Sequence, residues 1–241
     1  MHAILCAIPE ELSALRQQLH VEDRPSRHGA TQVWIGEHAG RPVALAMAGV
    51  GKVNAAAAAA VLLDRYEASA LIFSGVAGGL NPAFGVGSVL LGEKLAIHDF
   101  GMIADRAFVR TTSGINPIGA PTLEVVTPVR DDTRATLVRL RDAVAARLDA
   151  PVALGSLITA DYFLNCAATR DDLHAALGAD AIDMESGAVA QVAAAWGAPL
   201  YVIRTLSDQA GDDSHLSFTQ MADMASRNSA LCVTALLEIL D

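Results

Sequence analysis

The chain has 241 residues, of which 52% are hydrophobic and 5% aromatic, and its formal net charge is −10. This apolar content and a mean hydropathy of +0.36 exclude an intrinsically disordered chain. The excess of acidic residues argues against a nucleic-acid partner, because neutralising a phosphate backbone needs a basic face.

Predicted strands and helices alternate from the first residues onward. The apolar run His2–Ile8 predicts a buried strand. No basic segment precedes this run and it is too short to cross a bilayer, so we expect no signal peptide and no membrane partner. Pro9 suits the first turn of a helix, on which Leu12, Leu15 and Leu19 share one face.

The segments that follow predict two further strands, a helix and a glycine-rich turn. Val33–Glu37 and Pro42–Met47 predict strands joined by a tight turn, and Asn54–Tyr66 predicts a helix. Ala70–Phe73 predicts a buried strand that ends in the turn, over residues 74–80. Backbone N–H groups of such a turn can approach a sugar or a phosphate closely, although a plain strand-to-loop turn would use the same glycines.

The second half of the chain continues the alternation. Val86–Ile97 predicts one long strand or two broken ones, and Phe100–Pro121, which has no clean period, is expected to be a long functional loop or an oligomer contact. The later segments predict a helix over Asp131–Leu148 capped by Asp131 or Asp132, a strand over Val152–Ile158, helices over Arg170–Leu177 and Glu185–Trp196, a strand over Leu200–Leu206 and a helix over His215–Leu240.

This order predicts one α/β domain over residues 1–241, with a central, mostly parallel or mixed sheet flanked by helices. Ligands bind such sheets at the carboxyl ends of strands, where Glu11 and Ser207-Asp208 are expected to lie. Glu11, Glu185 and Asp208 could together activate water, hold sugar hydroxyls and protonate a leaving group. Each acid taken singly also fits a helix cap or a first-turn charge.

The histidines and cysteines predict neither a metal site nor a cofactor. His98 beside Asp99 and His215 beside Ser214 have no metal-binding spacing. Cys6, Cys166 and Cys232 are odd in number and form no C-x-x-C pair, which favours a reducing, cytoplasmic setting over a disulfide framework.

Five segments carry a resemblance to a known family: Ala7-Ile8-Pro9-Glu10-Glu11-Leu12, Gly49-Val50-Gly51-Lys52-Val53, Ser74-Gly75-Val76-Ala77-Gly78-Gly79-Leu80, Asp183-Met184-Glu185-Ser186, and Arg204-Thr205-Leu206-Ser207-Asp208 leading to Ser214-His215-Leu216-Ser217-Phe218. With these segments in this order, nearly the whole chain resembles the nucleoside phosphorylase superfamily. Within it the chain is most similar to the 5′-methylthioadenosine/S-adenosylhomocysteine nucleosidases.

The resemblance implies a role for each matching residue. Glu11 would be the general base that activates water, Arg204 would help to position that water, and Asp208, steadied by Ser207, would protonate the purine. Glu185 would hold the ribose hydroxyls. The other residues expected to bind substrate are Met184 at the sugar, Phe163 and Leu164 at the base, Ile8, Val50 and Phe218 at the 5′ side, and Val76, Ala77 and Gly78 in the glycine segment.

The implied reaction is hydrolysis of a purine nucleoside, without a cofactor, by a homodimer. The segment Pro9-Glu10-Glu11 stands where phosphorylases of the superfamily place glycine and arginine, and a glutamate there would repel phosphate. Three alternatives stay open: a nucleosidase for 6-oxopurine or futalosine-like nucleosides, a phosphate-dependent phosphorylase, and a non-catalytic nucleoside-binding protein. For the chemistry to work, the pKa of Asp208 should be raised, and Glu11 should lie in a more polar environment.

Overall fold

The computed structural model describes residues 1–124 and 126–240. Its helices are α1 (Pro9–Gln18), α2 (Lys52–Arg65), α3 (Asp131–Val144), α4 (Ala167–Leu177), α5 (Ser186–Trp196) and α6 (Ser214–Ile239). Its strands are β1 (His2–Cys6), β2 (His20–Val21), β3 (Ser26–His28), β4 (Thr31–His38), β5 (Arg41–Met47), β6 (Ala70–Gly79), β7 (Val89–Ile97), β8 (Gly101–Ala104), β9 (Ala107–Arg110), β10 (Thr127–Pro128), β11 (Val152–Thr159), β12 (Ala181–Asp183) and β13 (Leu200–Asp208).

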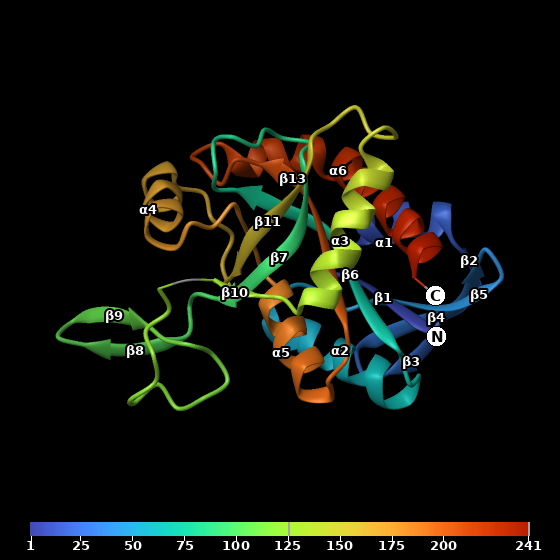
Figure 1. Cartoon of the computed structure of the whole chain (residues 1–241), viewed down its shortest axis with the longest axis horizontal. Coiled ribbons are helices and arrows are strands. Elements are labelled where there is room, and N and C mark those ends of the chain that lie inside the picture. Colours follow the sequence, from blue (N-terminus) through green and yellow to red (C-terminus); the bar gives the residue numbers. More distant parts are fainter. Residues whose placement is uncertain (125, 241) are drawn as a thin grey trace.

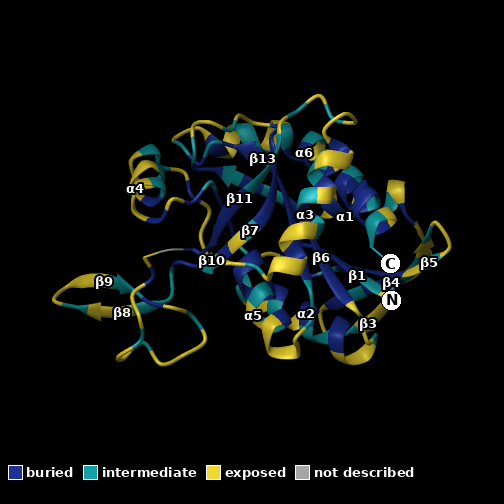
Figure 2. Cartoon of the chain, viewed as in Figure 1, coloured by how far each residue is buried: buried dark blue, intermediate teal, exposed yellow. Residues whose placement is uncertain are grey.

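The central sheet lies between two layers of helices, as predicted. Figure 1 shows α2 and α5 on one side of the sheet and α1, α3 and α6 on the other. Each layer has its own apolar core, built around Leu62 and Val189 on the α2–α5 side and around Leu15, Leu137 and Leu236 on the opposite side. In Figure 2 the strands between these layers are almost continuously buried. The predicted α/β fold with a flanked mixed sheet is therefore confirmed.

The sheet is mixed, and part of it closes on itself. Along its main path the strand order is β10-β7-β11-β12-β6-β1-β5-β4-β2. Strand β13 lies parallel to β6 and antiparallel to β7, so β7, β11, β12, β6 and β13 form a ring of paired strands. This closure brings the carboxyl ends of strands from both halves of the chain to one place.

The glycine-rich segment is a strand and not the turn that its composition predicts. Strand β6 continues from Ala70 through Gly79, paired with β13 over most of its length. A Cβ on Gly75 would lie 2.2 Å from Arg204 Nη1 and 2.3 Å from Glu11 Oε1. Glycine is needed here because two buried side chains occupy the space, and not because the backbone turns.

Other boundaries also differ from the prediction. Strand β13 extends through Ser207 and Asp208, which were expected to follow it. The irregular stretch after Phe100 contains a hairpin, β8–β9, which projects from the body in Figure 1. The cap predicted for α3 is wrong, because the helix begins at Asp131 and Arg130 occupies the capping position. The short strands β2, β3, β10 and β12 were not predicted.

Candidate active site

A cavity of 190 Å³ opens at the carboxyl ends of the strands. Its wall is formed by segments that follow β1, β5 and β11 and by the last residues of β6, β12 and β13. Every residue that the sequence assigned to the site lies in this wall except Arg204. The residues of the wall are Ala7, Ile8, Glu11, Val50, Val76, Ala77, Gly78, Tyr162, Phe163, Leu164, Ile182, Asp183, Met184, Glu185, Ser207, Asp208 and Phe218.

Backbone N–H groups after strand β1 and near the end of strand β6 hold the carboxylate of Glu11. Its Oε2 accepts hydrogen bonds from the N–H groups of Ala7 at 2.6 Å and Ile8 at 3.2 Å, and its Oε1 accepts one from Val76 at 3.0 Å. The carboxyl group is nevertheless buried, and burial raises its pKa although Arg204 and these donors lower it. The expected polar environment is therefore only partly present, because the polar groups are fixed donors rather than solvent.

Arg204 lies behind the cavity wall and is fully buried. Its Nε donates to Asp183 Oδ2 at 3.0 Å and its Nη2 to Glu185 Oε2 at 3.4 Å. Its Nη1 is 3.9 Å from Glu11 Oε1 and has no hydrogen-bond partner among the described residues. Burial alone would lower the pKa of Arg204, but the three carboxylates outweigh it and raise the pKa. The guanidinium thus lies between Glu11 and Glu185 on the side away from the cavity.

Asp183 is a site residue that sequence reasoning did not assign. Besides Arg204, its carboxylate accepts hydrogen bonds from Thr159 Oγ1 at 2.5 Å, from the hydroxyl of Ser186, and from the backbone of Glu185. It therefore fixes both the start of α5 and the orientation of Arg204. The signal that could have revealed it is an acid inside the quoted Asp183–Ser186 segment, but its strand, β12, is only three residues long.

Glu185 is the N-cap residue of α5 and lies in the cavity wall. Its Oε1 accepts a hydrogen bond from the N–H of Gly51 at 2.9 Å. Burial raises the pKa of Glu185 to about 7, with Arg204 acting in the opposite direction and Asp183 and Glu11 adding to the increase. Burial beside other carboxylates therefore makes ionisation of Glu185 costly, so part of the Glu185 population is protonated near neutrality.

Asp208 and Ser207 both face the cavity because β13 is irregular at its end. Leu206 pairs with Ala77 and Asp208 with Gly78, so Ser207 is an extra residue in the strand. In a regular strand neighbouring side chains point to opposite faces, and such a bulge re-aims one of them. Ser207 Oγ donates to Asp208 Oδ2 at 2.9 Å, which is the contact expected of a residue that steadies the acid.

The pKa of the Asp208 carboxyl group is raised above its ordinary value. Burial raises its pKa, and the Ala210 N–H and the Ser207 and Ser214 hydroxyls lower it without cancelling the effect. The direction agrees with the expectation from the sequence. A protonated carboxylic acid at the end of β13 can donate to a basic ring nitrogen.

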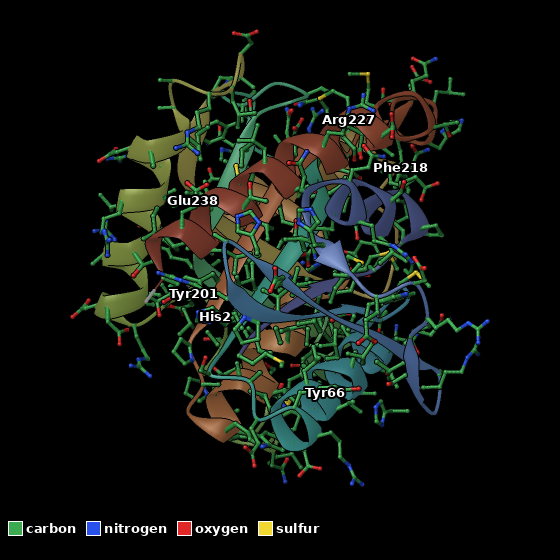
Figure 3. The ribbon with its side chains drawn as sticks, turned by 90° about the vertical axis from the view of Figure 1, so that its right-hand side faces the viewer. His2, Tyr66, Tyr201, Phe218, Arg227 and Glu238 are labelled. Carbon is green, nitrogen blue, oxygen red and sulfur yellow. The ribbon has the colours of Figure 1, made fainter. Side chains whose placement is uncertain are left out.

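Two aromatic rings, those of Phe163 and Phe218, form part of the cavity wall. Phe163, after β11, and Phe218, on α6, pack edge to face with ring centroids 5.9 Å apart. Figure 3 shows α6 crossing the molecule with Phe218 near its N-terminal end. Tyr162 also lies in the wall and was not predicted there; its hydroxyl is hydrogen-bonded to His98 Nε2 at 2.9 Å.

A second hollow, of 340 Å³, lies between α2 and α5. Val53 and Trp196 are among the residues that line it, and its described wall contains no carboxylate. Its single charged group is Lys52. The carboxylates that could carry acid–base chemistry therefore line the first cavity and not this hollow. Over the described residues, no group of three or more His, Cys, Asp or Glu could hold a metal ion, and no helix is long and apolar enough to cross a membrane.

The fold and the site define an α/β protein with a largely apolar cavity, whose wall also carries four carboxylates and the aromatic rings of Phe163 and Phe218. A ligand that fits these groups has a flat ring, hydroxyls and little negative charge. The sequence profile of the Phosphorylase superfamily matches residues 1–238, and the chain belongs to this family.

Three individual proteins are similar to this chain over nearly its whole length. The 5′-methylthioadenosine/S-adenosylhomocysteine nucleosidase of Mycobacterium bovis is 34% identical, over 98% of this chain and 96% of the relative. The nucleosidase of the same name from Neisseria meningitidis, solved in complex with methylthio-immucillin-A, is 27% identical with a TM-score of 0.85, over 99% and 98% of the two chains. The futalosine hydrolase of Helicobacter pylori also has a TM-score of 0.85, over 99% and 97%, but its 22% identity shows the fold alone.

Proposed function

We propose that the protein hydrolyses the N-glycosidic bond of a purine nucleoside. The observation that carries the proposal is that Glu11, Glu185 and Asp208, all buried and all with raised pKa values, line one cavity. Cleavage of this bond builds positive charge on the ribose and negative charge on the purine. Acids placed on opposite sides of one bound nucleoside meet both needs.

Each acid has a distinct place in the proposed reaction. Asp208 donates its proton to the purine, which is a poor leaving group until it is protonated. Glu11 removes a proton from the attacking water, and its raised pKa brings it closer to the range in which a general base works at neutral pH. Glu185 accepts hydrogen bonds from the ribose hydroxyls, with Met184 against the sugar and Phe163 against the base.

Water is favoured over phosphate as the nucleophile. The described wall of the cavity contains no arginine or lysine. Arg204, behind the wall, is already surrounded by Asp183, Glu185 and Glu11. A phosphate dianion in this position would face carboxylates without a free cation to bind it, which is costly in a buried site.

The proposed substrates carry an apolar 5′ substituent and a 6-aminopurine. Ile8, Val50 and Phe218 supply apolar surface on the proposed 5′ side of the cavity. The relatives' names point to 5′-methylthioadenosine and S-adenosylhomocysteine. A carboxyl group such as Asp208 can accept a hydrogen bond from an exocyclic amino group, which supports adenine over a 6-oxopurine.

The test is base release from methylthioadenosine, adenosylhomocysteine, adenosine, inosine and guanosine, each with and without phosphate. We expect adenine to be released fastest from the 5′-thio nucleosides, at a rate independent of phosphate. A rate that depends on phosphate would instead indicate a phosphorylase. Faster release of hypoxanthine or guanine than of adenine would indicate that the substrates are 6-oxopurine nucleosides. If no base were released from any of the nucleosides tested, the proposed enzymatic activity would be refuted.

We further propose that the protein is a cytoplasmic homodimer. The thiols of Cys6, Cys166 and Cys232 are free in the structure, which suits a reducing compartment. Ile103 and Phe108 on the β8–β9 hairpin are exposed apolar side chains of the kind that oligomer contacts cover. Light scattering on the protein as it elutes from a size-exclusion column would give its molar mass. A monomeric mass at micromolar protein concentration would contradict the dimer.

A further inference from the structure

A cluster of three charged side chains joins the segments that form two walls of the cavity. Lys52, the first residue of α2, places its Nζ 2.5 Å from Asp99 Oδ1 and 3.5 Å from Asp161 Oδ2. We propose that Lys52 is a positioning residue for nucleoside binding, acting through Asp99 and Asp161. The inference rests on the proposed function for its kinetic test, and a second test below is independent of it.

On one side, Lys52 continues the segment that reaches the sugar site. Val50 lies in the cavity wall, and the N–H of Gly51 donates to Glu185. The N–H of Lys52 itself donates to Asp161 Oδ1 at 2.9 Å. Backbone and side chain of one residue therefore both hold Asp161, which fixes the position of the Gly51 N–H relative to the opposite wall.

On the other side, Asp161 immediately precedes the residues of the aromatic wall. Its N–H donates to Asp99 Oδ2 at 2.9 Å. The next residue, Tyr162, is hydrogen-bonded to His98, so two consecutive residues of this segment are held by two consecutive residues after β7. Phe163 and Leu164 follow directly. The cluster thus determines where the proposed base-binding residues lie.

The charge balance makes Lys52 the group on which the cluster depends. Two carboxylates share one ammonium, and the Lys52 and Asp99 side chains are each about four-fifths buried, with exposed fractions of 20% and 22%. Without the cation, Asp99 and Asp161 would repel each other at close range in a partly desolvated site. Asp161, which is about half exposed, would move outward and take the Tyr162–Leu164 segment with it.

The kinetic test compares Lys52→Met, Lys52→Arg and Lys94→Met. Lys94 is the second of the chain's two lysines and has an exposed position on β7, so it is a matched control. For Lys52→Met we expect KM for methylthioadenosine to rise about tenfold while kcat stays within about threefold, since the reacting groups remain in place. Lys52→Arg, which keeps the charge, should recover most of the loss, and Lys94→Met should match the wild type.

The positioning role of Lys52 and the hydrolase activity can be tested independently of each other. A wild-type KM in Lys52→Met, a fall in kcat alone, or a Lys52→Arg variant as impaired as Lys52→Met would overturn the positioning role. Hydrogen exchange needs no substrate: the peptide containing residues 161–164 should exchange faster in Lys52→Met than in the wild type and in Lys94→Met. If the wild type released no base, the function would fail, and the exchange result would still decide the role of Lys52.

Discussion

Arg204 and the three carboxylates around it form one buried charged group in the site. Its guanidinium is fully buried and contacts Asp183 and Glu185 directly, with Glu11 a little further away. Burial raises the pKa values of Glu11 and Glu185, although the guanidinium of Arg204 lowers both. Asp208 lies outside this group and owes its raised pKa to burial alone. The two proposed catalytic acids are therefore controlled separately.

Replacing either catalytic acid by its amide should stop turnover without unfolding the protein. Asp208→Asn removes the proton donor, and Glu11→Gln removes the proton acceptor, so kcat should fall about 10²- to 10⁴-fold in each. Adenine release from methylthioadenosine measures the rate, and circular dichroism checks the fold. Wild-type rates in either variant would contradict the assigned roles.

Gly75→Ala should impair catalysis although Gly75 carries no functional group. The new methyl group would overlap Arg204 Nη1 and Glu11 Oε1, which have little room to move because both side chains are buried. We expect kcat to fall about 10²-fold, since misplacing a reacting group by 1 Å has effects of this size.

Gly85→Ala is the matched control, because a Cβ at Gly85 meets nothing within 4 Å. It should retain wild-type kinetics. If Gly75→Ala also retained them, the close contact between β6 and the buried pair would not constrain the site.

Glu185→Gln should change how stability depends on pH. The pKa of Glu185 is about 7 in the folded protein, against an ordinary value of 4.5 that applies to the unfolded chain. Between these two pH values the folded protein holds a proton that the unfolded chain releases. Its contribution to stability is present below about pH 4.5 and is lost as pH rises towards 7. Glutamine cannot titrate, so the variant should gain about 1–3 kcal/mol relative to the wild type between pH 5 and 7.

Urea unfolding of both proteins at several pH values measures this difference. A constant gap between the two curves would mean that Glu185 titrates normally in the folded protein.

The residues of the site could be predicted from the sequence more completely than their surroundings. Glu11, Glu185 and Asp208 stand out as acids at element ends. Asp183 could not be singled out, because its role depends on Arg204, Thr159 and Ser186 meeting it in space. The buried position of Arg204 was likewise not visible, since nothing in the local sequence shows that three carboxylates surround it.

At the scale of the elements, long segments with a clear apolar pattern were predicted well and short ones were missed. Helices α5 and α6 differ from their predicted ranges by at most one residue at each end. Strand β12 has three residues and is held by neighbours on both sides, so its conformation comes from pairing with β11 and β6 rather than from its own sequence. The bulge that directs Ser207 and Asp208 into the cavity likewise depends on strand pairing and not on the local sequence.

Helix α2 offers a test of packing within one element. Its buried face consists largely of alanines, which let the helix lie close to the sheet. Ala58 is fully buried, so Ala58→Leu should lower the free energy of unfolding by about 1–3 kcal/mol through overpacking. Ala57, one position along and exposed, is the control.

Urea unfolding of Ala58→Leu and Ala57→Leu would show the difference. We expect Ala57→Leu to remain within about 0.5 kcal/mol of the wild type. Equal effects at the two positions would contradict the close packing of this face.

At the scale of the whole molecule, closure of the strand ring assembles the site. Residues from near both ends of the chain, Glu11 and Phe218, reach one cavity because β6 pairs with β1 on one side and with β13 on the other. The alternation of strands and helices predicted the layers. It could not predict that β13 would also pair with β7, since that contact depends on the curvature of the complete sheet.

The proposed hydrolysis requires that water, and not phosphate, attacks the nucleoside. The direct measurement is the mass of the sugar product when methylthioadenosine is incubated with the protein in ¹⁸O-labelled water containing phosphate. We predict free adenine and free methylthioribose that carries one ¹⁸O atom from the solvent. A methylthioribose 1-phosphate product would contradict hydrolysis.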